Sequence, residues 1–143
     1  MESYRNLLIT GGAGFIGGAL IRKLLKESDC NVFNLDNLTY SADLTSINSL
    51  LKSSGSNLSE RYRFYKADIS ERSIINSILE EAQPDLIIHL AAETHVDKSI
   101  NSPDNFISSN IIGTFELLKS SLAYFEKVDE DIQKKFKFIH IST

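Results

Sequence analysis

The stretch TGGAGFIGGAL at residues 10–20 decides the fold that this sequence predicts. Four of the seven glycines in the chain fall within residues 11–17. Glycine loses more conformational freedom on folding than any other residue, so such a cluster indicates a turn that has no room for side chains. A short apolar run precedes the cluster, and Phe15–Glu27 after it carries apolar residues at helical spacing. The stretch therefore predicts a strand, a tight turn and a helix in succession.

The composition is that of an ordinary globular domain. The 143 residues are 42% hydrophobic and 24% charged, with a net charge of −4 and a pI near 5.3. This length holds one domain with a core of its own, and the acidic balance argues against a nucleic-acid partner. The single cysteine, Cys30, excludes an internal disulfide and a cysteine-based metal site. Without a signal-peptide layout or an apolar run of about 18 residues, we expect a cytoplasmic protein with no membrane partner and no metal.

Predicted strands and helices alternate along the rest of the chain. Strands are expected at residues 6–10, 31–35, 62–66, 85–92 and 136–141. Helices are expected at residues 15–27, 42–52, 70–82 and 103–125, with Ser70 as an N-cap, Pro103 in a first turn, a polar loop at 53–59 and a charged surface segment at 128–135. Such alternation implies parallel strands joined by right-handed crossovers. We therefore predict an α/β fold with a doubly wound parallel sheet of the Rossmann type, strand order 3-2-1-4-5, over residues 1–143.

The glycine turn falls where this sheet would bind a ligand, between the carboxyl ends of strands 1 and 4. The N-terminus of the following helix offers backbone N–H donors and a positive dipole end, which together favour a phosphate group. Gly12, Gly14 and Gly17 match the G-x-G-x-x-G spacing of dinucleotide-binding turns, and Gly11 opens a related spacing. The last glycine would let the helix lie close to the strand.

Two aspartates extend this prediction. Asp36 ends the second expected strand, nineteen residues after Gly17, close to the spacing of about 20 that such turns show. Its carboxylate could accept hydrogen bonds from the adenosine ribose and would repel a 2′-phosphate, which favours NAD over NADP. Asp68 and Ile69 could present an acceptor and a donor to the adenine. The alternatives are a purely structural turn beside a surface aspartate and, for Asp68, a solvated turn residue.

Polar residues also crowd the loop after the fourth expected strand, AAETHVDKSI at residues 91–100. The small side chains of Ala91 and Ala92 would let a ribose approach the strand end. His95 taken alone could be a solvated loop histidine, and Asp97 with Lys98 could be a surface ion pair of little energetic value.

These segments together resemble the extended short-chain dehydrogenase/reductase family and, within it, the dTDP-glucose 4,6-dehydratases. The resembling pieces are TGGAGFIG at 10–17, LDNLTYS at 35–41, ADI at 67–69, HLAAETHVDKSI at 89–100, SNIIGTFELL at 109–118 and HIST at 140–143. The glycine motif is common to the whole family, whereas LTY and AAETHVDKS are much more specific to the nucleotide-hexose 4,6-dehydratases.

The resemblance implies a role for each matching residue. The pyrophosphate is expected at Gly11, Gly14, Phe15, Ile16 and Gly17, and the adenosine ribose at Asp36, Asn37, Leu38 and Thr39. The adenine is expected at Asp68 and Ile69, and the nicotinamide half at Leu90, Ala91, Ala92 and Glu93, with Ser109 near the cofactor where the family usually has threonine. Thr94 is expected to reach the hexose, and Thr143 is expected to be the catalytic threonine that hydrogen-bonds the sugar O4.

The implied activity is that of an NAD-dependent nucleotide-sugar 4,6-dehydratase, a lyase that converts dTDP-glucose to its 4-keto-6-deoxy product and is a homodimer at full length. We expect its Tyr-x-x-x-Lys pair and its Asp–Glu pair to follow Thr143, and neither to lie within the 143 residues, so that this chain is an inactive N-terminal part. Two alternatives stay open: another NAD-dependent nucleotide-sugar epimerase or decarboxylase of the family, or a module that binds NAD without chemistry.

Overall fold

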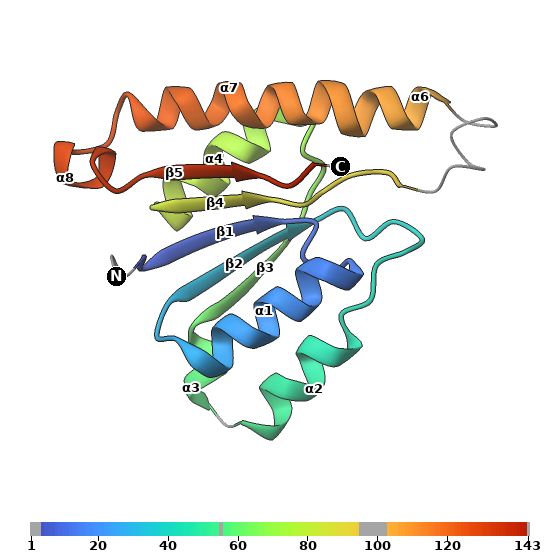
Figure 1. The fold of residues 1–143 in the computed structure, drawn as a ribbon, viewed down its shortest axis with the longest axis vertical. Coiled ribbons are helices and arrows are strands. Elements are labelled where there is room, and N and C mark those ends of the chain that lie inside the picture. The colour runs from blue at the N-terminus through green and yellow to red at the C-terminus, as the bar shows by residue number, and fades with distance from the viewer. Residues whose placement is uncertain (1–3, 55, 95–102, 143) are drawn as a thin grey trace.

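A five-stranded parallel sheet forms the centre of the molecule, with the strand order β3-β2-β1-β4-β5 (Figure 1). The computed structural model describes residues 4–54, 56–94 and 103–142. The strands are β1 Asn6–Thr10, β2 Asn31–Asp36, β3 Tyr62–Lys66, β4 Leu86–His89 and β5 Lys137–His140. The predicted fold class and strand order are confirmed.

Helices cover both faces of the sheet (Figure 1). One face carries α1 Phe15–Glu27, α2 Thr45–Ser53 and the short α3 Ser56–Glu60. The other face carries α4 Arg72–Ala82 and a long helical segment made of α6 Pro103–Phe106, the π-helix η1 Ile107–Gly113 and α7 Thr114–Phe125. A short helix, α8 Glu130–Gln133, precedes β5. None of the described helices is long and apolar enough to cross a lipid bilayer.

The central strand β1 is buried on both of its faces. Leu7 and Ile9 belong to the core between the sheet and α1 with α2, whereas Leu8 belongs to the core between the sheet and α4 with α7. Because side chains alternate along a strand, a strand between two helical layers is apolar throughout. This placement explains why the run before the glycines shows no alternation.

Strand β4 is shorter than the predicted strand at 85–92. Its partner β1 ends at Thr10, which pairs with His89. Beyond that pair the Leu90 N–H still donates to the Thr10 carbonyl at 3.0 Å, and the chain then leaves the sheet. Strand β5 likewise covers 137–140 rather than 136–141. The residues freed at the end of β4 line the cleft described below.

Two helices begin later in the sequence than predicted, and local hydrogen bonds from side chains to nearby backbone groups explain the difference. Helix α2 begins at Thr45 rather than residue 42, because the Asp43 carboxylate accepts the Thr45 N–H at 2.7 Å. Helix α4 begins at Arg72, and the predicted cap Ser70 instead donates its N–H and its hydroxyl to Asp68 at 2.8 and 2.7 Å. The predicted loop at 53–59 and the predicted surface segment at 128–135 contain α3 and α8, respectively.

The helix predicted at 103–125 contains a π-helical turn. Its apolar stripe faces away from the sheet, and the exposed fractions of its members lie between 46% and 63%: Ile107, Ile111, Ile112, Phe115, Leu118 and Leu122. The face that packs inward is narrower and includes Leu117 and Tyr124. Gly113 permits the closest approach, because a Cβ there would lie 2.6 Å from Ile69 Cγ1.

Candidate functional site

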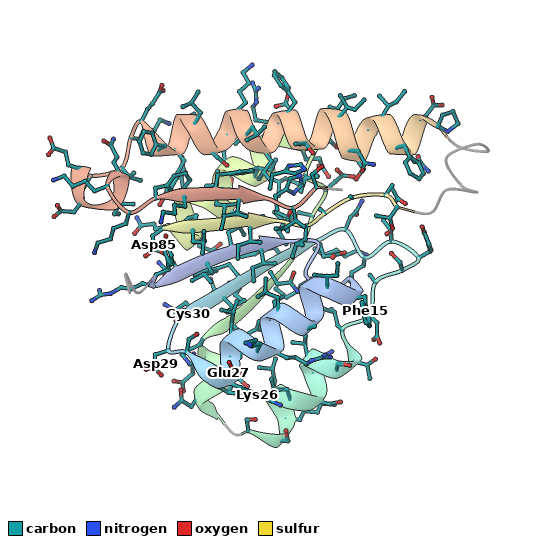
Figure 2. All side chains as sticks on the ribbon, in the orientation of Figure 1. Phe15, Lys26, Glu27, Asp29, Cys30 and Asp85 are labelled. Carbon is teal, nitrogen blue, oxygen red and sulfur yellow. The ribbon has the colours of Figure 1, made fainter. Side chains whose placement is uncertain are left out.

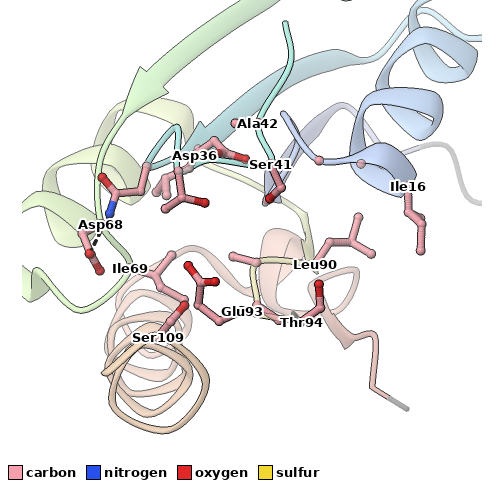
Figure 3. Close-up of a pocket in the computed structure, with 18 of the residues that line it drawn as sticks. Ile16, Asp36, Ser41, Ala42, Asp68, Ile69, Leu90, Glu93, Thr94 and Ser109 are labelled. Atoms are coloured by element: carbon pink, nitrogen blue, oxygen red, sulfur yellow. Dashed lines mark hydrogen bonds between the residues drawn. The ribbon is translucent and has the colours of Figure 1, made fainter. Parts of the chain in front are cut away.

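A cleft of about 580 Å³ lies at the carboxyl ends of the strands, within the size range of small-molecule sites. Its walls come from the glycine turn, the loops after β2, β3 and β4, and the α6–η1 segment. Figure 3 shows Asp68 and Ile69 on one side of this cleft and Ile16 on the other, with Leu90 and Thr94 between the walls. The strand order reverses here, where open α/β sheets bind their ligands.

The glycine turn fits tightly against the chain after β4. Gly11 has a φ of +73°, which side chains rarely adopt, and a Cβ there would lie 2.6 Å from the Ala91 nitrogen. A Cβ on Gly17 would lie 2.7 Å from the Gly12 Cα, so the helix closes directly on the turn, as predicted. The N-cap residue of α1 is Gly14, which has no side chain to cap the first turn, so N–H donors of this turn stay available to solvent or to a ligand.

Both carboxylate oxygens of Asp36 support the turn. One oxygen accepts the Ala13 N–H at 2.9 Å, and the other accepts the Leu38 N–H at 2.8 Å. Each oxygen has a second lone pair, so the carboxylate can still accept hydrogen bonds from a ligand in the cleft that it lines. Leu38 takes a left-handed φ of 55° to make its bond. Leu38 does not line the cleft, unlike its neighbours Asn37 and Thr39.

Asp68 ties two loops together at the other end of the cleft. Its carboxylate accepts the Asn37 side-chain amide at 2.9 Å, in addition to its two bonds from Ser70. This bond joins the loop after β2 to the loop after β3 (Figure 3). Ile69 lies beside it in the cleft wall and is 5% exposed. Asp68 is therefore a turn residue that also joins two loops of the cleft.

Comparison with known proteins places this architecture in a family. The family model described as GDP-mannose 4,6 dehydratase matches residues 8–143. The chain belongs to the GDP-mannose 4,6 dehydratase family. The predicted resemblance to nucleotide-hexose 4,6-dehydratases is thereby confirmed.

Sequence relatives of this GDP-mannose 4,6 dehydratase family member carry the name dTDP-glucose 4,6-dehydratase. The protein of Salmonella typhimurium is 45% identical over 137 residues, which cover 96% of this chain and 36% of the relative. The protein of Neisseria gonorrhoeae is 40% identical over 142 residues, which cover 99% of this chain and 39% of the relative. The chain thus spans less than two-fifths of the length of these relatives.

Solved structures of similar fold include both dehydratases and epimerases. The dTDP-glucose 4,6-dehydratase of Bacillus anthracis, in complex with NAD, has a TM-score of 0.74 at 29% identity and covers 97% of this chain and 37% of its own. DesIV, the dTDP-glucose 4,6-dehydratase of Streptomyces venezuelae with NAD and TYD bound, has a TM-score of 0.71 at 34% identity. The match covers 82% of this chain and 36% of DesIV. The UDP-glucose 4-epimerase of Thermotoga maritima with UDP-glucose has a TM-score of 0.72 at 32% identity. The match covers 96% of this chain and 38% of the epimerase.

The cleft of this GDP-mannose 4,6 dehydratase family member brings together nearly all the predicted binding residues. Its lining contains Gly11, Gly14, Phe15, Ile16, Gly17, Asp36, Asn37, Thr39, Asp68, Ile69, Leu90, Ala91, Ala92, Glu93, Thr94 and Ser109. The predictions for Thr143, and the possibilities raised for His95, Asp97 and Lys98, lie outside the described residues. Within the described ranges, no group of three His, Cys, Asp or Glu side chains could hold a metal ion.

Sequence reasoning missed several residues of the cleft wall. Asn105 and Ser108 line it beside Ser109, and their spacing of three and four residues on one helical segment was a usable signal. Ser41 and Ala42 line the opposite wall, directly after the LTY segment. These residues widen the polar surface available to a ligand.

Asn110 was missed as well, although it fixes the backbone of Glu93. The Glu93 N–H donates to the Asn110 side-chain oxygen at 2.8 Å, and the Asn110 amide donates to the Glu93 carbonyl at 3.0 Å. The side-chain amide thus pairs with Glu93 much as a neighbouring strand would. Tyr40, in the loop after β2, lies near Glu93. The pKa of Tyr40 is raised, first by desolvation, then by the charge of Glu93 and by a hydrogen bond to it. The loops after β2 and β4 therefore meet at the cleft.

His89 lies beneath the cleft and is 1% exposed. Its Nδ1 lies 2.6 Å from the Thr10 hydroxyl, and its Nε2 lies 3.0 Å from the Thr114 hydroxyl. Burial, followed by the charge of the neighbouring His140, lowers the pKa of His89 to about 4. The imidazole is therefore neutral near pH 7 and links β1, β4 and α7.

We expected no Tyr-x-x-x-Lys sequence in the chain, but one is present. Tyr62 and Lys66 have this spacing, but they lie on β3, where four residues span about 13 Å. The Tyr62 hydroxyl accepts the Asn34 side-chain amide at 2.9 Å, and Lys66 is exposed. A strand thus keeps the two groups too far apart to act as a tyrosine–lysine pair.

Proposed function

We propose that this chain binds NAD in the cleft and is the N-terminal part of a nucleotide-sugar 4,6-dehydratase that acts on dTDP-glucose. One observation carries the proposal: the carboxylate of Asp36 lines the same cleft as the uncapped first turn of α1. A dinucleotide needs both features, because its pyrophosphate seeks N–H donors and its adenosine ribose seeks an acceptor. The negative charge of Asp36 supports NAD over NADP.

The remaining walls fit the rest of NAD. Gly14 leaves room for the pyrophosphate, because a Cβ there would meet only the Gly11 carbonyl oxygen at 3.3 Å. Ile69 supplies an apolar surface for the adenine, and the small Ala91 and Ala92 supply a floor for the nicotinamide half. When bound, NAD supplies a hydride acceptor at that end. The chain's own task is to bind the cofactor, orient it and exclude water from it.

The sequence relatives support a dehydratase over an epimerase. The curated relatives from Salmonella and Neisseria carry the dehydratase name at 45% and 40% identity. The Streptomyces relative is described with NAD and TYD bound, which supports a thymidine nucleotide substrate. Thr94 lies in the cleft wall next to Glu93, where it could reach a hexose beyond the nicotinamide. An epimerase of the family is the second candidate, because the Thermotoga epimerase has a similar TM-score of 0.72.

Turnover requires groups that we assign to the rest of a longer enzyme. The chain spans 36% and 39% of the Salmonella and Neisseria relatives, and no tyrosine–lysine pair lines the described cleft. We assign the Tyr-x-x-x-Lys pair and the Asp–Glu pair to the remaining part, with Thr143 as the hydroxyl nearest to them in sequence. The full-length enzyme is proposed to be a cytoplasmic homodimer.

Calorimetric titration of the 143-residue chain with NAD, NADP and AMP tests the cofactor assignment. We expect binding of NAD and AMP, weaker binding of NADP, and no 4-keto sugar on incubation with dTDP-glucose. Absence of NAD binding would contradict the cofactor assignment, and release of a 4-keto sugar would contradict the assignment of the catalytic pairs to the remaining part. For the full-length protein, formation of a 4-epimer instead of a keto sugar would favour the epimerase.

A further inference from the structure

A chain of hydrogen bonds runs beneath the cleft from its floor to helix α7. The Ala91 N–H lies 3.3 Å from the Thr10 hydroxyl oxygen, which lies 2.6 Å from His89 Nδ1. On the far side of the ring, Nε2 lies 3.0 Å from the Thr114 hydroxyl. Thr10 and His89 are 0% and 1% exposed, so water does not compete for these bonds.

The Ala91 N–H determines which atom donates and which accepts in each of these hydrogen bonds. The Ala91 N–H can only donate, so the Thr10 oxygen accepts from it and turns its own proton toward Nδ1. Nδ1 is then an acceptor, and the proton of the neutral ring lies on Nε2, where it donates to Thr114. The lowered pKa of His89 agrees with a neutral ring. The histidine thus fixes the rotation of the Thr10 hydroxyl.

This series of hydrogen bonds ends at the backbone of Ala91, which forms part of the cleft floor. Ala91 lines the cleft, and its nitrogen also lies where Gly11 comes closest, because a Cβ on Gly11 would be 2.6 Å away. Three contacts therefore hold the glycine turn and the floor of the cleft at a fixed separation. They are the packing of Gly11 on Ala91, the backbone bond from Leu90 to Thr10, and the bond from the Ala91 N–H to the hydroxyl that His89 orients.

We propose that His89 is a positioning residue for the cofactor: by orienting the Thr10 hydroxyl it holds the Ala91 backbone where the nicotinamide half of a dinucleotide must lie. This inference rests on the proposed NAD binding. The proposed adenosine site lies at Asp36 and the Asp68–Ile69 wall, and the bonds around His89 do not reach these residues. The effect of His89 is therefore confined to ligands that extend over Ala91.

Titration of substituted chains with NAD and with AMP separates positioning from general loosening. His89→Leu removes both ring nitrogens at similar volume, and we expect NAD to bind about tenfold more weakly while AMP changes less than about twofold. His89→Asn places an amide oxygen near the position of Nδ1, and we expect it to restore most of the lost NAD affinity. Thr10→Val keeps the volume of the threonine and removes the hydroxyl, so it should reproduce the NAD-specific loss even if His89→Leu does not fold.

Tyr124→Phe is the matched control, because it removes a buried hydrogen bond of 3.1 Å to the Pro84 carbonyl at a distance from the cleft. It should lower the melting temperature and leave both affinities unchanged. Equal weakening of NAD and AMP, or unchanged NAD affinity in folded His89→Leu and Thr10→Val, overturns the inference alone. Absence of NAD binding by the unsubstituted chain overturns the proposed function and the inference with it.

Discussion

At the scale of single residues, Asp36 has the structural role described above, and we propose that it also binds the cofactor. Asp36→Asn keeps the shape of the side chain and removes its charge, so we expect NAD affinity to fall about tenfold and the preference over NADP to shrink. Asp36→Ala should weaken NAD binding further, because Ala13 and Leu38 then lose their acceptor. Titration of both cofactors measures the two effects.

Asp85 provides the control for this substitution. Its carboxylate accepts two backbone N–H groups, from Arg5 at 2.8 Å and Asn6 at 3.0 Å, at the opposite end of the sheet (Figure 2). Asp85→Asn should therefore cost stability without changing the NAD to NADP ratio. An unchanged ratio in Asp36→Asn would remove Asp36 from the cofactor site.

Gly14 tests the phosphate position. A Cβ at Gly14 meets only one backbone oxygen at 3.3 Å, so Gly14→Val should fold and yet lose NAD binding, because the branched side chain would occupy the place of the pyrophosphate. Gly18→Ala is the control, since its Cβ lies at an ordinary contact distance of 3.6 Å. Circular dichroism and calorimetry together check this prediction, and normal NAD affinity in Gly14→Val would make the turn purely structural.

His89 gives the fold a defined pH dependence. Its pKa is lowered from 6.5 to about 4, so the unfolded chain takes up a proton below pH 6.5 that the folded chain refuses until about pH 4. Stability from this group is thus complete above pH 6.5 and is lost as the pH falls to 4, by about 3 kcal/mol in all. Among the described residues, His140 on β5 lies beside the ring, and the hydroxyls of Thr10 on β1 and Thr114 on α7 bond to its two nitrogens.

Urea unfolding at several pH values measures this loss. The carboxylates of the chain titrate in part of the same range, so the informative quantity is the difference between the native chain and His89→Asn. We expect a steeper fall between pH 6.5 and 4 in the native chain. Equal slopes would show that His89 does not hold its neutral form on folding.

At the scale of elements, Gly113 lets the π-helix η1 pack closely against Ile69. A Cβ there would meet Ile69 Cγ1 at 2.6 Å and Cδ1 at 2.8 Å, so Gly113→Ala must move either the helix or the isoleucine that lines the cleft. We expect a loss of about 1–3 kcal/mol in stability and weaker AMP binding. Ile69→Ala in the same chain should relieve the clash and return part of the stability. Additive losses in the double variant, measured by urea unfolding, would contradict this geometry.

Local sequence signals predicted the strands and the order of the sheet well, because β1 and β4 are apolar on both faces and the glycines end β1 abruptly. They failed where a distant partner decides the outcome. Strand β4 stops at His89 because β1 stops at Thr10, and the Asn110 amide then takes over the pairing of Glu93. The π-helical turn was equally unpredictable, since helical periodicity does not distinguish it from an α-helix.

The candidate site was predictable where chemistry is local, as at the glycine turn and Asp36. The bond from Asn37 to Asp68 and the bonds around His89 join segments 25 to 79 residues apart, and no spacing rule reveals them. The resemblance implies a place near the ribose for Leu38, and its backbone N–H donates to the Asp36 carboxylate. Side-chain hydrogen bonds between segments distant in sequence were thus the main source of error.

At the scale of the whole molecule, η1 and α7 present an exposed apolar face. Its residues are at least 46% exposed, and Ile139 and Ile141 add 41% and 50% exposure beside β5. Exposed apolar patches of this extent favour association, so we expect the 143-residue chain to self-associate. Leu118→Lys with Leu122→Lys should reduce the mass seen by light scattering without changing NAD affinity. Monomeric behaviour of the unsubstituted chain at high concentration would contradict this prediction.

The strand order also has a consequence for how the chain folds during synthesis. Thr10 of β1 and His89 of β4 are bonded neighbours although 79 residues separate them. At about 5–20 residues per second, a ribosome needs roughly 4–16 s to add that length. During this interval β1 and β2 can pair, but the other edge of β1 has no partner. The nascent chain therefore leaves one hydrogen-bonding edge of the apolar strand β1 unpaired for seconds, which is when chaperone binding would matter most.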